Sequence, residues 1–141
     1  MNNSTIVCID ANIVTQRVIS NAGEDLWEDW AQSSIRLVAP TLLYYEVTNS
    51  LYRYLKTGIF TLDTVEKTLR AALALPIELV GEAHLHQRAK DLAAKFNLPA
   101  AYDAHYLALA EHLDAELWTA DKHLFNTVHS YGVEWVKLVE M

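Results

Sequence analysis

The stretch Ile6-Val7-Cys8-Ile9-Asp10 contains the first sign of the fold. Four apolar residues in a row, with no polar alternation, are typical of a strand that is buried on both faces, as strands of parallel sheets are. A second run, Leu117-Trp118-Thr119-Ala120, leads directly into Asp121. Each run ends in a carboxylate, where packing alone would not put a charge. The two stretches therefore predict buried strands with acidic carboxyl ends.

Outward from these strands, helical and extended patterns alternate along the chain. Further strands are predicted over residues 35–39, 116–119 and 133–139, and residues 77–80 form a short apolar run. The alternation predicts a single α/β domain over residues 1–141, with a mainly parallel central sheet flanked by helices on both faces. Pro40 is expected in the first turn of the third helix. Apolar residues at helical spacing predict helices over residues 11–19, 24–33, 40–56, 61–73, 82–96, 102–113 and 122–130.

Composition narrows the class of protein. A chain of 141 residues that is 52% hydrophobic can form one sizeable core. The net charge of −7 argues against a protein that coats nucleic acid by bulk electrostatics. It does not exclude a nuclease, because carboxylates that hold metal ions are counted as negative. The N-terminus lacks the basic segment of a signal peptide and no apolar run approaches a membrane span, so we expect a cytoplasmic protein.

Two further acids stand in helical stretches. Glu46 shares a polar helical face with Ser50 and Arg53. That face is either solvated or turned toward a site, where Arg53 could bind a phosphate. Asp103 has only apolar neighbours on its helical face, so its burial without a partner would be costly. Its place in the first helical turn gives partial relief through the helix dipole.

The four acids are best explained together. Asp10 and Asp121 could each simply cap the following helix, which is worth about 1 kcal/mol. However, ligands of open α/β sheets bind beyond the carboxyl ends of the strands, so both carboxylates enter one crevice if their strands are neighbours. Four clustered acids would repel one another and raise one another's pKa unless a cation neutralised them. We therefore predict a site for a hard divalent metal formed by Asp10, Glu46, Asp103 and Asp121.

Four motifs carry a resemblance to a known family: Ile9-Asp10-Ala11-Asn12, the segment from Pro40 through Glu46 to Asn49, the helix Tyr102-Asp103-Ala104-His105-Tyr106-Leu107-Ala108-Leu109-Ala110, and Thr119-Ala120-Asp121-Lys122. In this order, across nearly the whole chain, they resemble the PIN-domain family, and specifically its small toxin ribonucleases of the VapC type. The resemblance implies a parallel sheet flanked by helices and a nuclease site that depends on Mg²⁺ or Mn²⁺.

The resemblance also assigns roles to residues. Asp10, Glu46, Asp103 and Asp121 would be the catalytic, metal-binding cluster that hydrolyses RNA, and a toxin of this family would form a homodimer and bind a cognate antitoxin. Asn12 and Thr119 would be supporting polar groups. Many members carry another acid shortly after the last Asp, but here the sequence continues Lys122-His123-Leu124, so a second metal would bind weakly or only with substrate.

Cations and histidines complete the set of candidates. Arg53 and Lys122 are expected to bind the substrate, with Arg17 and Lys56 as further cations that could flank the crevice and guide RNA. Zinc would need a different ligand set: His84 and His86, two apart, point to different faces of a helix. His105 and His112 share a face, but no cysteine accompanies them. Solvated helix positions account for these histidines.

Two other functions fit the sequence less well. A phosphatase of the haloacid dehalogenase type also has an Asp after its first strand, but its chemistry needs a second Asp two positions on, where this chain has Asn12. A non-catalytic PIN-like module that binds RNA or protein would be expected to have lost acids, and none of the four is missing. The simplest alternative, an α/β domain whose acids are only caps and surface charges, leaves Glu46 and Asp103 as coincidences.

Overall fold

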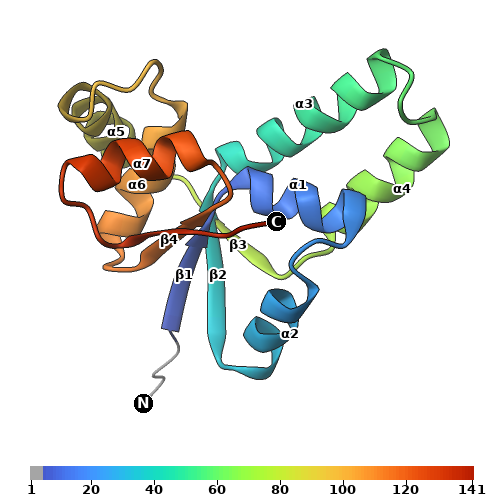
Figure 1. Cartoon of the computed structure of the whole chain (residues 1–141), viewed down its shortest axis with the longest axis horizontal. Helices are drawn as coiled ribbons and strands as arrows, with labels where there is room; N and C mark the ends of the chain where they lie inside the picture. Colours follow the sequence, from blue (N-terminus) through green and yellow to red (C-terminus); the bar gives the residue numbers. More distant parts are fainter. Residues whose placement is uncertain (1–4) are drawn as a thin grey trace.

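Five strands form one sheet in the computed structural model, which describes residues 5–141. Their order is β3-β2-β1-β4-β5, and every neighbouring pair is parallel. The predicted parallel sheet is therefore confirmed, with β1 at its centre (Figure 1). The strands are β1 (Thr5–Ile9), β2 (Ile35–Pro40), β3 (Ile77–Val80), β4 (Glu116–Thr119) and β5 (Val136–Leu138).

Helices cover both faces of this sheet, as predicted. The strand order runs outward from β1 in both directions, and right-handed crossovers then place α1–α4 on one face and α5–α7 on the other (Figure 1). Within residues 5–141, every helix is too short or too polar to span a bilayer. The helices are α1 (Ala11–Ser20), α2 (Glu24–Gln32), α3 (Leu42–Lys56), α4 (Leu62–Leu73), α5 (Ala83–Lys95), α6 (Tyr102–His112) and α7 (Lys122–Ser130).

The core explains why β1 has no polar alternation. Val7, Cys8 and Ile9 are all buried, because helices pack on both sides of the central strand. The thiol of Cys8 lies 3.7 Å from the carbonyl oxygen of Tyr106 on α6, and burial raises the pKa of this thiol. Residues 106–110 of α6 are completely buried as well. A helix buried nearly all round holds its first turn, and thus Asp103, in a fixed place.

Two predicted element boundaries were wrong. Pro40 does not begin a helix; it ends β2, where a missing N–H is tolerated, and α3 begins at Leu42. The last strand covers only Val136–Leu138 instead of residues 133–139, because its one neighbour, β4, is itself only four residues long. The apolar run at residues 77–80 is the edge strand β3, paired with β2.

Candidate functional site

Asp10 and Asp121 lie side by side because their strands are neighbours. β1 pairs with β4, and the backbone N–H of Asp10 donates to the carbonyl oxygen of Trp118 at 3.0 Å. Each Asp also caps a helix: Asp10 Oδ1 accepts from the N–H of Ala11 at 2.7 Å, and Asp121 Oδ1 accepts from the N–H of Leu124 at 3.1 Å. Each Asp therefore caps a helix and also lies at the carboxyl end of its strand, next to the other Asp.

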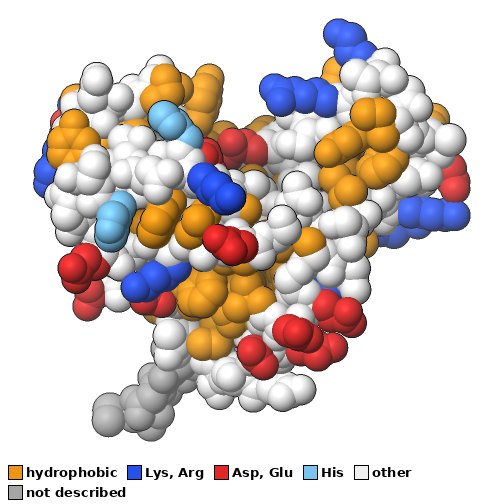
Figure 2. Space-filling view, in the orientation of Figure 1, with side chains coloured by type: hydrophobic (Ala, Val, Ile, Leu, Met, Phe, Trp, Pro, Cys, Tyr) orange, Lys and Arg blue, Asp and Glu red, His pale blue; other side chains and the backbone are white. Residues whose placement is uncertain are grey.

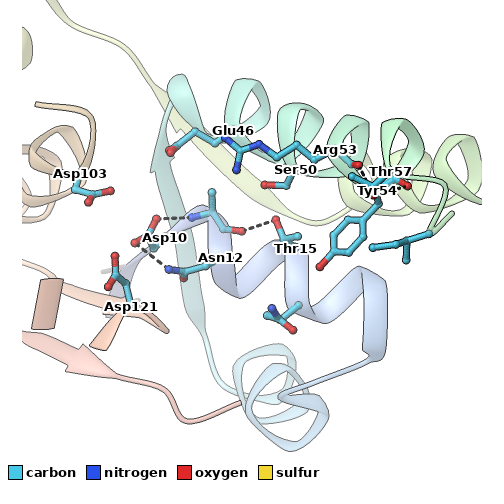
Figure 3. A pocket seen from close by; sticks show the side chains of 13 residues that line it. Asp10, Asn12, Thr15, Glu46, Ser50, Arg53, Tyr54, Thr57, Asp103 and Asp121 are labelled. Atoms are coloured by element: carbon cyan, nitrogen blue, oxygen red, sulfur yellow. Dashed lines mark hydrogen bonds between the residues drawn. The ribbon is translucent and has the colours of Figure 1, made fainter. Parts of the chain in front are cut away.

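All four acids predicted from the sequence line one cleft. Its volume is about 540 Å³, and it contains Asp10 from the end of β1, Glu46 from α3, Asp103 from α6 and Asp121 from the end of β4. Figure 3 shows these carboxylates turned toward a common space. In Figure 2, acidic side chains are visible in the notch between the α3–α4 arm and the helices on the other face of the sheet.

Polar groups behind Asp10 fix the geometry of the two strand ends. Thr119 Oγ1 donates to Asp10 Oδ2 at 2.9 Å and accepts from the backbone N–H of Asp121 at 3.0 Å. Asn12 Oδ1 accepts from the N–H of Ala120 at 3.0 Å, and its Nδ2 lies 3.4 Å from Asp10 Oδ2. The structure thus places the predicted supporting residues Asn12 and Thr119 directly against the acidic cluster.

Burial and mutual repulsion raise the pKa values of three of the four carboxyl groups in the cleft. Burial, followed by the charge of Asp103, raises the pKa of Asp10 to about 7, although the Thr119 hydroxyl opposes the shift. Burial raises the pKa of Asp103, with a further contribution from Asp121. Burial also raises the pKa of Glu46. In the ion pairs among residues 5–141, none of these four carboxylates has a Lys, Arg or His partner.

The donor set fits a hard divalent cation. Carboxylate oxygens are the ligands that Mg²⁺ and Mn²⁺ prefer, and the cleft offers four carboxylates, none of which forms an ion pair within the part of the chain that the structure describes. Among the described residues, no three of these acids have oxygens that all lie within 4.8 Å of one another. This spacing suits an ion that keeps several water ligands and binds only one or two carboxylates directly, which is the usual habit of Mg²⁺ in proteins.

The cleft continues along α3, away from the carboxylates. Ser50 and Arg53 line it, as the polar face of this helix suggested, whereas Lys122 is exposed and lies outside its lining. Tyr54 and Thr57 also line the cleft and were missed (Figure 3). Their signal was present in the sequence, because they continue the helical spacing that begins at Glu46.

Sequence reasoning also missed one supporting residue, Tyr106. Its hydroxyl donates to Glu46 Oε1 at 2.7 Å, and its side chain is completely buried. Burial and the nearby acids raise the pKa of this phenol, which is therefore neutral and a donor. In the sequence Tyr106 belongs to the apolar face beneath Asp103, and nothing local indicated a bond to a residue of α3.

The fold and the cleft define an α/β protein with four acidic side chains gathered at the carboxyl edge of its sheet. A family model described as PIN domain matches residues 8–138, so the chain belongs to the PIN-domain family, as the sequence motifs suggested. No curated protein sequence matches the chain.

Solved structures share this fold at low sequence identity. The chain in the crystal structure of PAE2754 from Pyrobaculum aerophilum has 21% sequence identity to this one and superposes with a TM-score of 0.69. The match covers 88% of this chain and 86% of that chain. A chain of VapBC2 from Rickettsia felis, in a structure bound to a DNA fragment from the promoter, has 13% sequence identity and a TM-score of 0.71. The match covers 96% of this chain and 98% of that chain. A toxin–antitoxin complex from Klebsiella pneumoniae is 17% identical over 92% and 94%, with a TM-score of 0.63.

Proposed function

We propose that this protein is a Mg²⁺- or Mn²⁺-dependent endoribonuclease that hydrolyses RNA phosphodiester bonds, and that it acts in the cytoplasm as the toxin of a type II toxin–antitoxin pair. The observation that carries the proposal is the convergence of Asp10, Glu46, Asp103 and Asp121 on one cleft, where none of them has an ion-pair partner among residues 5–141. Membership of the PIN-domain family supports the same assignment.

In this proposal the four carboxylates are the catalytic and metal-binding residues. Asp10 and Asp103 are the principal ligand candidates, because both lie in the cleft and repel each other when ionised. Glu46 is held at Oε1 by Tyr106, which leaves Oε2 free to accept a proton or a hydrogen bond from water in the cleft. A bound divalent ion would stabilise the charge that develops on the phosphoryl oxygens and make the attacking water more acidic.

The substrate would lie along α3. From Glu46 the cleft passes Ser50 and Arg53 and reaches Tyr54, so it offers a cation for a phosphate group and an aromatic ring for a base (Figure 3). The Tyr54 ring is stacked on Phe60 with 4.9 Å between the ring centroids, which restrains it. With a net charge of −7, the protein would hold RNA through this cleft and its cation rather than through bulk charge.

The proposed partners are a second copy of the chain and an antitoxin. The support is the likeness to solved VapBC structures and to a structure described as a toxin–antitoxin complex. Light scattering on the purified chain tests the dimer. Co-purification with the product of an adjacent gene, together with loss of RNA cleavage on binding, tests the antitoxin.

The decisive experiment is cleavage of a panel of single-stranded and structured RNAs by the purified protein with Mn²⁺. We expect cleavage that disappears with EDTA and in Asp10→Asn, a variant that keeps the helix-capping capacity of the side chain. The matched control is Asp29→Asn, which alters an exposed acid on α2 and should cleave like the wild type. Cleavage that persists in Asp10→Asn would overturn the assignment, and a folded wild type that binds Mn²⁺ without cutting any RNA would favour a binding module.

A further inference from the structure

A second group of metal-ligating side chains lies at the far end of α6 from the cleft. It consists of Glu82, His84 and His112, and one ligand atom of each lies within 4.8 Å of the others. Among residues 5–141, no other three acids, histidines or cysteines lie this close together, and the acids of the cleft do not either. His84 Nδ1 is 3.3 Å from Glu82 Oε2, and the His84 and His112 rings are in contact, with 4.6 Å between their centroids.

This pairing differs from both arrangements considered from the sequence. His84 contacts His112 rather than His86, and His86 Nδ1 lies 3.0 Å from His105 Nε2. The spacing of the histidines within each helix therefore did not indicate their contacts, because each contact joins a residue of α5 to a residue of α6. His84, His86 and His112 are exposed, in agreement with the solvated helix positions predicted for them, but they lie in contacting pairs rather than singly.

The helices already hold the three ligands close together. Glu82 is the N-cap residue of α5, yet its side chain makes no capping bond and its carboxylate lies beside His84 instead. His84 is in the first turn of α5, and His112 is the last residue of α6. Arg88 of α5 donates two hydrogen bonds to Glu111 of α6, at 2.6 and 2.9 Å, which fixes the register of the two helices beside the cluster.

We propose that Glu82, His84 and His112 bind a transition-metal ion of the Zn²⁺ class. Two imidazoles and one carboxylate form a ligand set that suits Zn²⁺ and its neighbours Co²⁺ and Ni²⁺, whereas Mg²⁺ prefers an all-oxygen environment. Three protein ligands leave a fourth, solvent-facing position for water. Protons compete for the imidazole nitrogens, so binding weakens as the pH falls.

The consequence of binding is a clamp between α5 and α6. Asp103 and His112 stand in the first and last turns of α6, nine residues apart, which is about 14 Å along a helix axis. The ion would therefore stiffen the helix that carries a cleft carboxylate without entering the cleft. Ligand binding to the folded state alone raises the unfolding temperature, so Zn²⁺ should stabilise the protein independently of RNA cleavage.

The test is calorimetric titration of Zn²⁺ into the full chain, purified without a histidine tag, stripped of metal and kept in excess Mg²⁺. We expect one Zn²⁺ per chain for the wild type and for Asp10→Asn, with binding at least tenfold weaker in His84→Gln and in His112→Gln. The matched control, His123→Gln, changes an exposed histidine of α7 and should bind like the wild type. Co²⁺ in place of Zn²⁺ should show visible absorption bands that the two ligand variants lose.

Three outcomes would overturn the proposal: no binding to the wild type, unchanged binding in His84→Gln and His112→Gln, or binding lost in Asp10→Asn, which would place the ion in the cleft. Unfolding curves recorded without metal distinguish a misfolded variant from one that has lost a ligand. The outcome is independent of nuclease activity, because no step of the measurement uses RNA.

Discussion

The phenol of Tyr106 donates a 2.7 Å hydrogen bond to Oε1 of Glu46 and thereby joins α6 to α3 beside the acidic cleft. The two residues are 60 positions apart in the sequence. The bond opposes the rise in the pKa of Glu46 that burial causes. It also fixes one oxygen of the carboxylate, so Tyr106 is a positioning residue for the cleft.

Tyr106→Phe should lower cleavage about tenfold at limiting Mn²⁺, because groups that orient metal-binding carboxylates typically matter by this factor or more. The loss should shrink at saturating Mn²⁺, and it is measured as cleavage rate against Mn²⁺ concentration. Tyr44→Phe is the control: the Tyr44 hydroxyl donates to the carbonyl oxygen of Ala72 at 2.7 Å, away from the cleft. Equal cleavage by both variants at every Mn²⁺ concentration would contradict the role given to Tyr106.

Asp10→Asn should stabilise the metal-free protein at neutral and higher pH. The pKa of Asp10 is about 7 in the folded state and near its ordinary value, 3.8, in the unfolded state. The folded protein therefore keeps a proton that the unfolded chain releases, and stability falls as the pH rises from about 4 to about 7. Asn stays neutral throughout and still caps α1.

The measurement is thermal unfolding in EDTA at pH 5 and pH 8. The Tm of Asp10→Asn should exceed that of the wild type by several degrees at pH 8 and by less at pH 5. With Mn²⁺ the advantage should shrink or reverse, because the cation neutralises the wild-type cluster. A Tm difference that is the same at both pH values would show that Asp10 does not carry the raised pKa.

Thr119→Val removes a hydroxyl that donates to Asp10 and accepts from the backbone N–H of Asp121. The pKa of Asp10 should rise further, because the Thr119 bond is one of the interactions that lower it. We expect the pH at which Mn²⁺-dependent cleavage is half-maximal to move upward, with a loss of about 1–3 kcal/mol in the free energy of unfolding.

The control for this variant is Thr68→Val on α4, whose hydroxyl donates only to the carbonyl oxygen of Thr64. Its pH profile should match that of the wild type. If Thr119→Val loses stability while its pH profile stays in place, Thr119 supports the fold but does not tune Asp10.

Arg53→Ala should weaken RNA binding more than it slows chemistry. Arg53 lines the cleft on α3 and can donate to a phosphate, so we expect KM to rise about fivefold to tenfold while kcat changes by less than twofold. The dependence of binding on salt should also become shallower, because one phosphate contact is lost. The control is Arg70→Ala on α4, because Arg70 does not line the cleft. Lys122→Ala should have a smaller effect than Arg53→Ala, because Lys122 does not line the cleft either. A large fall in kcat would instead assign Arg53 to the transition state.

The sequence by itself determined the features that arise from local patterns. The unbroken apolar run before Asp10 and the largely apolar run before Asp121 identified the two strands at the site, because a strand buried on both faces has no polar alternation. Helical spacing after Glu46 placed Ser50 and Arg53 on the same polar face of α3, but it left open whether that face is solvated or lines a site. The boundaries at Pro40 and Val136 were less predictable, because a strand ends where its neighbour ceases to offer backbone partners.

Only the tertiary structure decided which of these features meet. The pairing of β1 with β4 brings Thr119 to Asp10 across 109 residues, and the packing of α6 brings Tyr106 to Glu46. The crossing of α5 and α6 likewise joins His84 to His112. Such contacts leave no periodic trace in the chain, because they depend on how whole elements pack rather than on the spacing of residues within one element.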